Sequence, residues 1–334
     1  IPIFIHPELD SELGISHGIS PESVERALLD YPDAKAVLVI NPTYFGFVAD
    51  LQKIVQIVHN YNIPVIVDEA HGVHIKFHDD LPLSAMQVGA DMAATSVHKL
   101  GGSMTGSSVL NVKEGLVSAK RVQSILSMLT TTSTSYPLLA SLDTARRQLA
   151  INGYDLLDEA IRLAKDTRKR INSIPHLSCV GREKLGSSAT FDMDPTKLLI
   201  SVKDLGITGH EAEEWLRQNA NVEVELSDLY NILCVVTIAD TKKEMNLLVN
   251  ALTRLSKHFD SEAIVTSVKV TIPEIPALAM TPRDAFYAAT ESIPLAESEG
   301  YICAEFIMVY PPGIPIFIPG EIITKENIEY IQMN

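Results

Sequence analysis

Cysteine is scarce in this sequence of 334 residues, and Cys179, Cys234 and Cys303 lie far apart. This spacing gives neither a disulfide framework nor a zinc-binding pattern, and it indicates a reducing, cytoplasmic environment. No run of about 18 apolar residues is present, so no membrane-spanning helix is predicted. No basic segment precedes an apolar stretch near the first residue, so no signal peptide is predicted either.

Basic residues are few relative to acidic ones: 27 Lys and Arg stand against 42 Asp and Glu, which gives a net charge of −15. Nucleic-acid binding needs clustered basic side chains, so we expect no nucleic-acid partner. A small cationic substrate is compatible with this charge. Residues 260–334 hold three basic and eleven acidic residues and eight of the 18 prolines. We interpret them as a separate acidic C-terminal domain.

The apolar residues, with aromatic ones included, make up 46% of the chain and form alternating strand and helix patterns in its first half. Ser20-Pro21 is a typical helix start, and Leu51 to Val58 has helical spacing. We expect short strands over 35–40, 63–67, 91–95 and 108–112, the first buried on both faces. The alternation predicts a mostly parallel α/β sheet covered by helices on both sides.

The second half predicts a smaller α+β unit. Residues 113–174 are helical in pattern, and Thr208 to Glu211 is a capping box that opens another helix. Further strands are expected over 197–202, 222–226 and 232–238, with a last helix over 242–259. We therefore predict three domains: a cofactor-binding domain over 1–155, a small α+β domain over 156–259, and the C-terminal domain over 260–334.

The first chemical motif is the apolar strand that ends in Asp68-Glu69-Ala70-His71. Carboxylates at the end of a buried strand lie where open α/β sheets bind ligands. An NTPase would also place an acidic residue there, but it needs a Gly-Lys-Ser or Gly-Lys-Thr phosphate loop, which this sequence lacks. A purely structural carboxylate remains an alternative for this motif taken alone.

The second motif is Ser96-Val97-His98-Lys99, which is followed by Gly, Ser and Thr residues up to Gly106. A lysine at the end of a short buried strand is poorly explained by packing. Desolvation lowers the pKa of an enclosed lysine, and the neutral amine can form a Schiff base with an aldehyde. With Asp68 as a partner for a pyridine nitrogen, the two motifs meet the needs of pyridoxal 5'-phosphate.

The chain resembles the Orn/Lys/Arg decarboxylases, which are pyridoxal-phosphate enzymes of the aspartate-aminotransferase fold (fold type I). The resemblance covers nearly the whole chain and is most specific in two segments, S-x-H-K and the C-terminal string Tyr310–Glu321. The shorter, biosynthetic arginine decarboxylases are the most similar branch. Four segments carry the resemblance: NPTYFG at 41–46, VDEAHGVH at 67–74, GADMAATSVHK at 89–99 and YPPGIPIFIPGE at 310–321.

The resemblance implies a role for each matching residue. Lys99 would form the Schiff base with the cofactor, and Asp68 would pair with the pyridine nitrogen. Ser96 and His98 would lie at the cofactor, and Lys99 or His98 would protonate the product carbon. The remaining residues would line the pocket: Ala70 and His71 at the ring, Thr43 and Tyr44 at the edge, and Glu305 and Tyr310–Gly313 near the substrate entrance.

The expected activity is decarboxylation of a basic amino acid in polyamine biosynthesis, with arginine first and lysine or ornithine next. The alternatives are another fold-type-I reaction, such as transamination, and a non-catalytic partner or fragment. The family's phosphate loop and ring-stacking side chain belong to an N-terminal part that is absent here, so a further N-terminal segment or separate chain would complete the site. We expect a homodimer or a higher homo-oligomer.

Two other features admit more than one interpretation. His71, His74 and His78 suggest a metal site, but their spacing does not match that of helical zinc ligands, so we predict none. The Ser/Thr run at 130–135 would serve either as a phosphate-binding stretch shared between subunits or as a loop that caps a helix.

Overall fold

The structure is a computed structural model that describes residues 2–259, 273–309 and 314–333. The chain divides into two compact units. The larger unit spans Ile5–Val265, and the smaller one combines Ile1–Phe4 with Thr266–Asn334. No helix among the described residues has both the length and the apolar character needed to cross a membrane.

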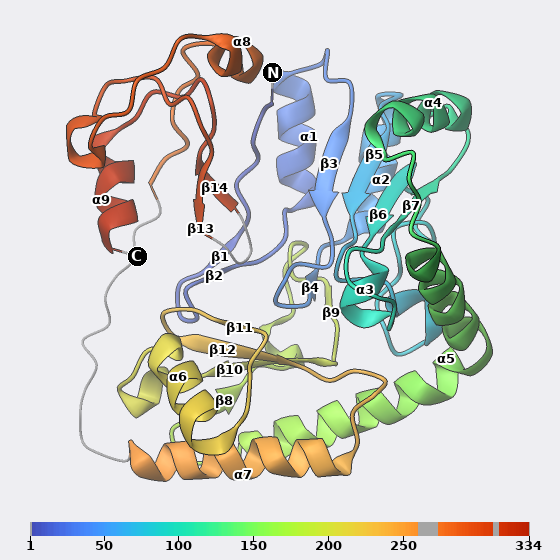
Figure 1. Ribbon diagram of the computed structural model, residues 1–334, viewed down its shortest axis with the longest axis vertical. Coiled ribbons are helices and arrows are strands. Elements are labelled where there is room, and N and C mark those ends of the chain that lie inside the picture. Colours follow the sequence, from blue (N-terminus) through green and yellow to red (C-terminus); the bar gives the residue numbers. More distant parts are fainter. Residues whose placement is uncertain (1, 260–272, 310–313, 334) are drawn as a thin grey trace. The chain divides into compact units, whose positions relative to one another are not determined.

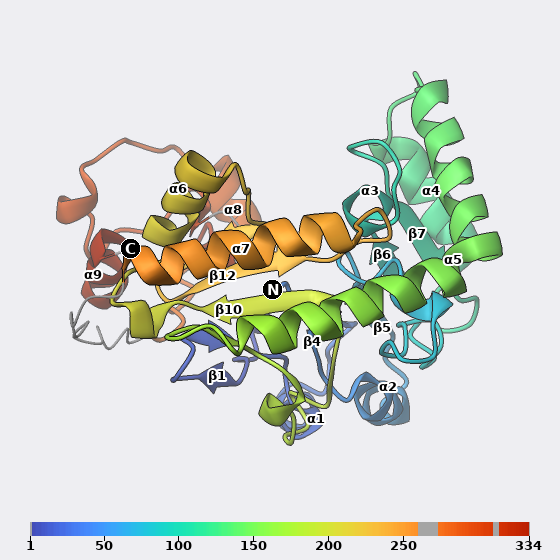
Figure 2. The ribbon, with the colours of Figure 1, turned by 90° about the horizontal axis from the view of Figure 1, so that it is seen from below.

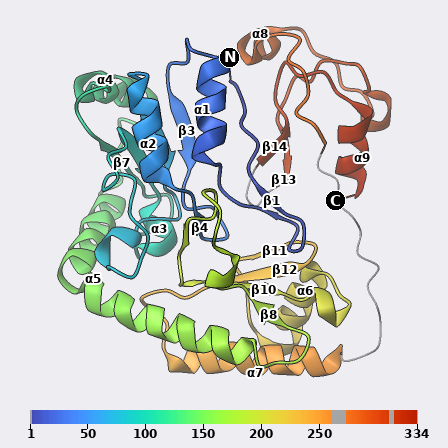
Figure 3. The same cartoon turned by 180° about the vertical axis from the view of Figure 1, so that it is seen from behind.

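The larger unit contains the predicted mostly parallel sheet, which is confirmed. Its strand order is β3-β5-β6-β7, with two parallel pairings and one antiparallel pairing at β7. Helices α1 and α2 cover one face of the sheet (Figure 3), and their apolar side chains form a core with Val39, Val65 and Val67. The elements are β3 (Val37–Ile40), β5 (Val65–Asp68), β6 (Met92–Thr95), β7 (Val109–Val112), α1 (Pro21–Asp30) and α2 (Leu51–Asn60).

The opposite face of this sheet is largely uncovered within the described residues. Along β3, Val37 and Val39 are buried, whereas Leu38 and Ile40 are 65% and 54% exposed. The prediction that strand 35–40 is buried on both faces is therefore wrong, because the strand alternates and only one face has helices packed on it. The prediction that helices cover both sides of the sheet is wrong for the same reason. The same row of the uncovered face contains Ile40, Asp68 and Ala94.

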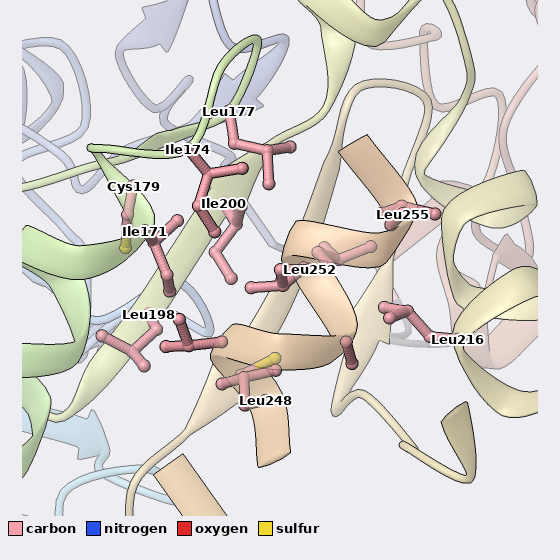
Figure 4. Packing of buried hydrophobic residues seen from close by; sticks show 14 of the residues in the cluster. Ile171, Ile174, Leu177, Cys179, Leu198, Ile200, Leu216, Leu248, Leu252 and Leu255 are labelled. Atoms are coloured by element: carbon pink, nitrogen blue, oxygen red, sulfur yellow. The ribbon is translucent and has the colours of Figure 1, made fainter. Parts of the chain in front are cut away.

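A second, antiparallel sheet has the strand order β11-β12-β10-β8. Helices α5, α6 and α7 pack against it, and Figure 2 shows α5 and α7 running side by side along the sheet. Leu198 and Ile200 interlock with Leu248 and Leu252 in the largest apolar core (Figure 4). The elements are β8 (Ser178–Cys179), β10 (Lys197–Ser201), β11 (Leu226–Ser227), β12 (Asn231–Val235), α5 (Tyr136–Ile171), α6 (Gly209–Ala220) and α7 (Lys242–His258).

The predicted strand over 222–226 is wrong except for Leu226. Asn221 adopts a left-handed conformation at the end of α6, and the N–H of Val222 still bonds to the carbonyl of Leu216. The backbone therefore completes the helix cap before it can pair with β12. The capping box at Thr208 and Glu211 is confirmed.

Short elements connect the two sheets (Figure 1). Strand β4 (Phe47–Val48) pairs with β9 (Asp192–Met193), which brings the loop after β3 against the start of β10. Residues 130–135 join α4 to α5, and Ser135 is the N-cap of α5. The remaining elements of this unit are β1 (Leu9–Asp10), β2 (Ile15–Ser16), α3 (Val97–Leu100), α4 (Ala119–Leu129) and the 3-10 helices η1 (Ile75–Phe77), η2 (Arg182–Lys184) and η3 (Lys203–Leu205).

The smaller unit has its own core, in which Cys303, Phe317, Ile323 and Ile328 are buried together. Among the described residues, an antiparallel strand pair contributes Phe317 to this core and the last helix contributes Ile328. The predicted entrance turn Tyr310–Gly313 lies outside the described residues. The elements are α8 (Pro282–Tyr287), η4 (Leu295–Glu297), β13 (Ile307–Val309), β14 (Ile314–Phe317) and α9 (Lys325–Met333).

Candidate active site

The ends of β5 and β6 place four predicted residues at one edge of the parallel sheet. Asp68 is the last residue of β5 and lies in register with Ala94 of β6. Ser96 follows β6 directly and is the N-cap of α3, which carries His98 and Lys99 (Figure 1). These residues thus come from neighbouring strand ends, where open α/β sheets bind ligands.

The Lys99 side chain is exposed and approaches two of the predicted pocket residues. Its Nζ lies 3.0 Å from Nε2 of His71 and 5.8 Å from the centre of the Tyr44 ring. The rings of Tyr44 and His71 are 4.3 Å apart at their centres and tilted by 51°. The structure therefore brings Lys99, His71 and Tyr44 together.

His71 is buried, with 6% of its surface exposed. Burial lowers its pKa to about 3, and the positive charges of Lys197 and Lys99 act in the same direction. The imidazole is consequently neutral at neutral pH. A neutral imidazole has one N–H donor and one acceptor nitrogen, so its two ring nitrogens make different hydrogen bonds.

The carboxylate of Asp68 makes few hydrogen bonds with the protein. Its Oδ1 accepts a hydrogen bond of 3.0 Å from the backbone N–H of Ala70, and the described residues supply no other. Next to it, the backbone N–H of Asn41 donates to the Asp68 carbonyl. The side chain of Asn41 is buried, and its Nδ2 has no hydrogen-bond partner among the residues that the structure describes. An acceptor and an unused donor thus occur at the same sheet edge.

Ser96 and His98 are predicted to lie at the cofactor, and the loop after α3 orients His98. His98 Nδ1 donates to the carbonyl of Ser107 over 2.8 Å, which fixes the orientation of the ring. The hydroxyl of Ser96 makes no capping hydrogen bond in α3. No hydrogen bond links either side chain to Asp68 or His71 in the described part of the chain. Their contact with a phosphate stays a prediction.

Thr43 has a structural role in the loop after β3. Its Oγ1 accepts from the backbone N–H of Phe47 over 3.1 Å and so closes the turn that contains Tyr44. This turn follows the cis peptide bond between Asn41 and Pro42. A role of Thr43 at the cofactor also stays a prediction.

Sequence reasoning missed Asp194 and Lys197, which approach the site from the second sheet. The Asp194 carboxylate is fully buried and accepts from the N–H and Oγ1–H of Thr196 at 2.9 and 2.6 Å. Its Oδ2 lies 3.0 Å from Nε2 of His74. The Nζ of Lys197 lies 3.3 Å from Nδ1 of His71. The available signal was a lysine at the start of an apolar strand.

The three histidines of this segment have separate partners. His71 lies between two lysines, His74 contacts Asp194, and His78 stacks on the ring of Tyr154. Across residues 2–259, 273–309 and 314–333, no three His, Cys, Asp or Glu side chains are grouped so as to hold a metal ion.

A cavity of about 460 Å³ opens beside Lys99. It lies between α3, the loop before β11 and the N-terminal end of α7. Lys99 and Leu100 line one side, and the acidic residues Glu223, Glu225 and Asp240 are among those that line the other. The carboxylate of Glu225 also accepts a hydrogen bond of 2.8 Å from the Tyr44 hydroxyl.

Comparison with known families covers both units. Residues 1–244 match the major domain of the Orn/Lys/Arg decarboxylases, and residues 266–334 match the C-terminal domain of the same family. The chain belongs to the Orn/Lys/Arg decarboxylase family. The predicted family membership is therefore confirmed.

Curated members of this family are similar over the whole chain. The chain is 65% identical to the arginine decarboxylases of Bacillus anthracis and Bacillus subtilis, over 334 and 335 residues. Both alignments include 100% of this chain and 68% of the relative.

Solved structures agree on the fold. The E. coli constitutive lysine decarboxylase superposes with a TM-score of 0.80 at 21% identity, covering 100% of this chain and 59% of that one. The chain thus spans less than two thirds of this solved relative. The fold-type-I architecture expected from the sequence is confirmed by this superposition.

Proposed function

We propose that the chain carries the lysine and aspartate part of a pyridoxal-phosphate-dependent site that decarboxylates arginine to agmatine. The observation that carries this proposal is the 65% identity to curated arginine decarboxylases along the full chain. The placement of Lys99 opposite His71, with Asp68 at the neighbouring strand end, supplies a matching chemistry.

The residues at the sheet edge fit the cofactor in three respects. Lys99 offers an exposed amine for an aldehyde, and Asp68 offers a carboxylate with a single internal hydrogen bond. The unused amide of Asn41 offers a buried donor at the same edge. When bound, pyridoxal phosphate supplies a protonated ring that withdraws electrons from the bond to the departing carboxylate.

The protein residues would then act on charge and protons around that ring. Asp68 would keep a pyridine nitrogen protonated through a charge-assisted hydrogen bond. His71 would present a neutral ring beside the cofactor. Lys99 Nζ, or His98 Nε2, would carry the proton that replaces the lost carboxylate, with Lys99 favoured by its contact with His71.

The cavity beside Lys99 supports a cationic substrate. Of its acidic lining residues, Glu223 already pairs with Arg217, whereas Glu225 and Asp240 would attract a guanidinium or ammonium group. Planar guanidinium groups bind carboxylates in a bidentate manner, which suits arginine before lysine or ornithine.

We further propose that the chain acts in polyamine biosynthesis in the cytoplasm as a homodimer. Support for a reducing location comes from Cys179, Cys234 and Cys303, which are all free and buried. The uncovered face of the parallel sheet, which contains Asp68, leaves room for an additional segment or chain.

Absorbance tests the cofactor part of the proposal. Purified chain given pyridoxal phosphate should develop a Schiff-base band near the visible edge that borohydride removes. Lys99→Ala should lack the band, whereas Lys120→Ala, which changes an exposed lysine of α4, should keep it. The absence of a band in the unmodified chain would contradict cofactor binding by this chain.

Carbon dioxide release tests the substrate. Arginine should give the fastest release among arginine, lysine and ornithine in a preparation that shows the band. Faster release from lysine would reassign the substrate. A band with no release from any of the three would favour another reaction, such as transamination.

A further inference from the structure

Four acidic residues line the cavity beside Lys99, and they differ in the partners that their carboxylates already have. A carboxylate that is occupied within the chain gains less from a bound cation, because the existing hydrogen bonds or ion pairs have to be exchanged. The partners therefore indicate which carboxylate is available to a cationic substrate. The four residues are Glu223, Glu225, Asp240 and Glu244.

Glu223 is held by an arginine of the chain itself. Both of its carboxylate oxygens accept from Nε of Arg217 over 2.9 Å. The guanidinium group of a substrate would have to displace another guanidinium group, with no gain in the number of contacts. Glu223 is therefore a poor candidate for direct contact with the substrate.

Asp240 and Glu244 stabilise the start of α7. Oδ2 of Asp240 accepts from the backbone N–H and the hydroxyl of Thr237 over 2.7 and 2.8 Å, which closes the turn before the helix. Glu244 accepts from the backbone N–H of Thr241 over 3.0 Å and completes the capping box of α7. Both carboxylates therefore already serve the local backbone.

Glu225 has a fixed main chain and an available carboxylate. Its backbone N–H donates to the carbonyl of Leu233 over 2.8 Å, which holds the residue against β12. Its exposed side chain forms no ion pair with the described residues and accepts one hydrogen bond, from the Tyr44 hydroxyl to Oε1. Within the described part of the chain, Oε2 receives no donor.

Tyr44 connects Glu225 with the candidate cofactor site. Its ring centre lies 4.3 Å from the centre of the His71 ring and 5.8 Å from Nζ of Lys99. The hydroxyl of the same ring reaches Glu225 over 2.8 Å. One tyrosine side chain therefore spans from the lysine to the carboxylate. A basic amino acid likewise has its α-amine and its distal cation at opposite ends of one side chain.

We infer that Glu225 is a specificity-determining residue, which contacts the distal guanidinium group of the substrate, and that Tyr44 is the positioning residue that orients it. A guanidinium group offers a carboxylate two parallel N–H groups, which an ammonium group does not. The contact therefore favours arginine over lysine and ornithine. This inference rests on the proposed function, because it takes the α-amine end of the substrate to lie at Lys99.

Binding to the cofactor-free chain tests the contact without catalysis. An NMR titration of the isotope-labelled chain with arginine, and separately with lysine, gives both dissociation constants and reports the fold of each variant in the same spectra. The unmodified chain should bind arginine more tightly than lysine. Glu225→Gln should weaken arginine binding about tenfold, as for the loss of one charge-assisted partner, and lysine binding by less.

Glu223→Gln is the matched control, because it removes the same charge from the lining of the same cavity. Arginine binding should change by less than about twofold in this variant, since Glu223 is paired with the exposed Arg217. Equal losses in the two variants would contradict the inference, because general attraction by negative charge would then explain the binding. An unmodified chain that does not bind arginine would contradict it as well.

A double-variant cycle tests the positioning role of Tyr44. Tyr44→Phe removes the hydroxyl, keeps the ring, and should weaken arginine binding about threefold. In the Glu225→Gln background the same change should have no further effect, because no carboxylate is left to orient. If Tyr44→Phe weakened arginine binding equally in both backgrounds, its role would be structural and the positioning role would be wrong.

Failure of this inference is distinguishable from failure of the proposed function. The absence of a Schiff-base band in the unmodified chain would remove the cofactor role of Lys99, whatever the affinity for arginine. Arginine binding that is unchanged in Glu225→Gln, in a preparation that shows the band and releases carbon dioxide from arginine, would overturn only the role of Glu225.

Discussion

Two buried carboxylates, one on each side of the candidate site, differ in the direction of their pKa shifts. Glu69 follows β5 of the parallel sheet, and burial raises its pKa to about 7. Asp194 precedes β10 of the antiparallel sheet, and its pKa is lowered although burial acts in the opposite direction. The two side chains are 4% and 0% exposed, so burial alone does not explain the difference.

The partners of the two carboxylates explain it. Glu69 accepts one hydrogen bond, from the backbone N–H of Ala85 at 2.6 Å. Asp194 interacts with His74 and Lys197 and accepts two hydrogen bonds from Thr196. Positive neighbours and donors on Asp194 outweigh its desolvation. The antiparallel side therefore carries a compensated buried charge, and the parallel side carries an uncompensated one.

Removal of Asp194 should have the largest effect on the fold. Asp194→Ala would leave Lys197 and His74 buried without their carboxylate, and broken buried pairs cost about 3–5 kcal/mol. Urea unfolding at neutral pH measures this loss.

The matched control is Asp80→Ala, which removes an exposed ion pair of 2.8 Å with Lys165. Exposed ion pairs contribute about 0–1 kcal/mol, so the free energy of unfolding of this variant should be within about 1 kcal/mol of the parent value. Equal losses for Asp194→Ala and Asp80→Ala would show that the buried carboxylate is not compensated as described.

The second largest loss of stability is expected for Gly46→Ala, which would displace the aliphatic part of the Lys197 side chain. Gly46 has a φ of +91° and lies against Lys197, so Gly46→Ala adds both backbone strain and a collision. We expect a loss of about 2–5 kcal/mol, from about 1–2 for the strain and about 1–3 for overpacking. Thermal and urea unfolding would measure it.

Gly89→Ala separates the two contributions. Gly89 also has a φ of +91°, but an added Cβ would meet only the end of the Lys113 side chain at 3.7 Å. This variant should therefore lose only the stability that the backbone strain costs, about 1–2 kcal/mol. If the two alanine variants were equally stable, the packing of Lys197 on Gly46 would not contribute.

The sequence predicted the parallel side of the site better than the antiparallel side. Asp68 and Lys99 each end a short local pattern, a buried strand followed by polar residues, and both occur at the expected sheet edge. Local periodicity also located α1, α2 and the capping box of α6. These features depend on residues close together in the chain.

The antiparallel side depends on contacts that local patterns do not contain. Lys197 contacts His71 across 126 positions, and Asp194 contacts His74 across 120. The strand pair that brings them together, β4 with β9, has two residues in each strand. Periodicity in so short a strand gives no signal. The same limit applies to β3, whose exposed face depends on which helices pack against the sheet.

Glu69 should produce a pH-dependent effect of intermediate size. Its pKa in the folded chain, about 7, exceeds the ordinary value of 4.5, so the stability it contributes is present below about pH 4.5 and lost as the pH rises through about 7. Glu69→Gln keeps the acceptor for Ala85 without the charge. Across this pH range the variant should become progressively more stable than the parent, by about 3 kcal/mol once the pH exceeds about 7.

Unfolding free energies at several pH values test this expectation. Glu25→Gln, an exposed change on α1, should differ from the parent by at most about 0.5 kcal/mol throughout. Asp194 gives the opposite sign, because its lowered pKa makes its stabilisation disappear as the pH falls below 3.8. A constant difference between Glu69→Gln and the parent would contradict the uncompensated charge at Glu69.

The smallest effect is expected for the hydrogen bond that links the two sides. The Tyr44 hydroxyl, from the loop after β3, donates to Glu225, which precedes β11, over 2.8 Å. Tyr44→Phe keeps the ring against His71 and should cost about 0.5–1.5 kcal/mol in unfolding experiments. Tyr136→Phe, at a tyrosine that is 80% exposed, serves as the control and should cost nothing measurable. A larger loss for Tyr44→Phe than for Gly46→Ala would mean that this surface bond, and not the buried Lys197 and Asp194, holds the two sides together.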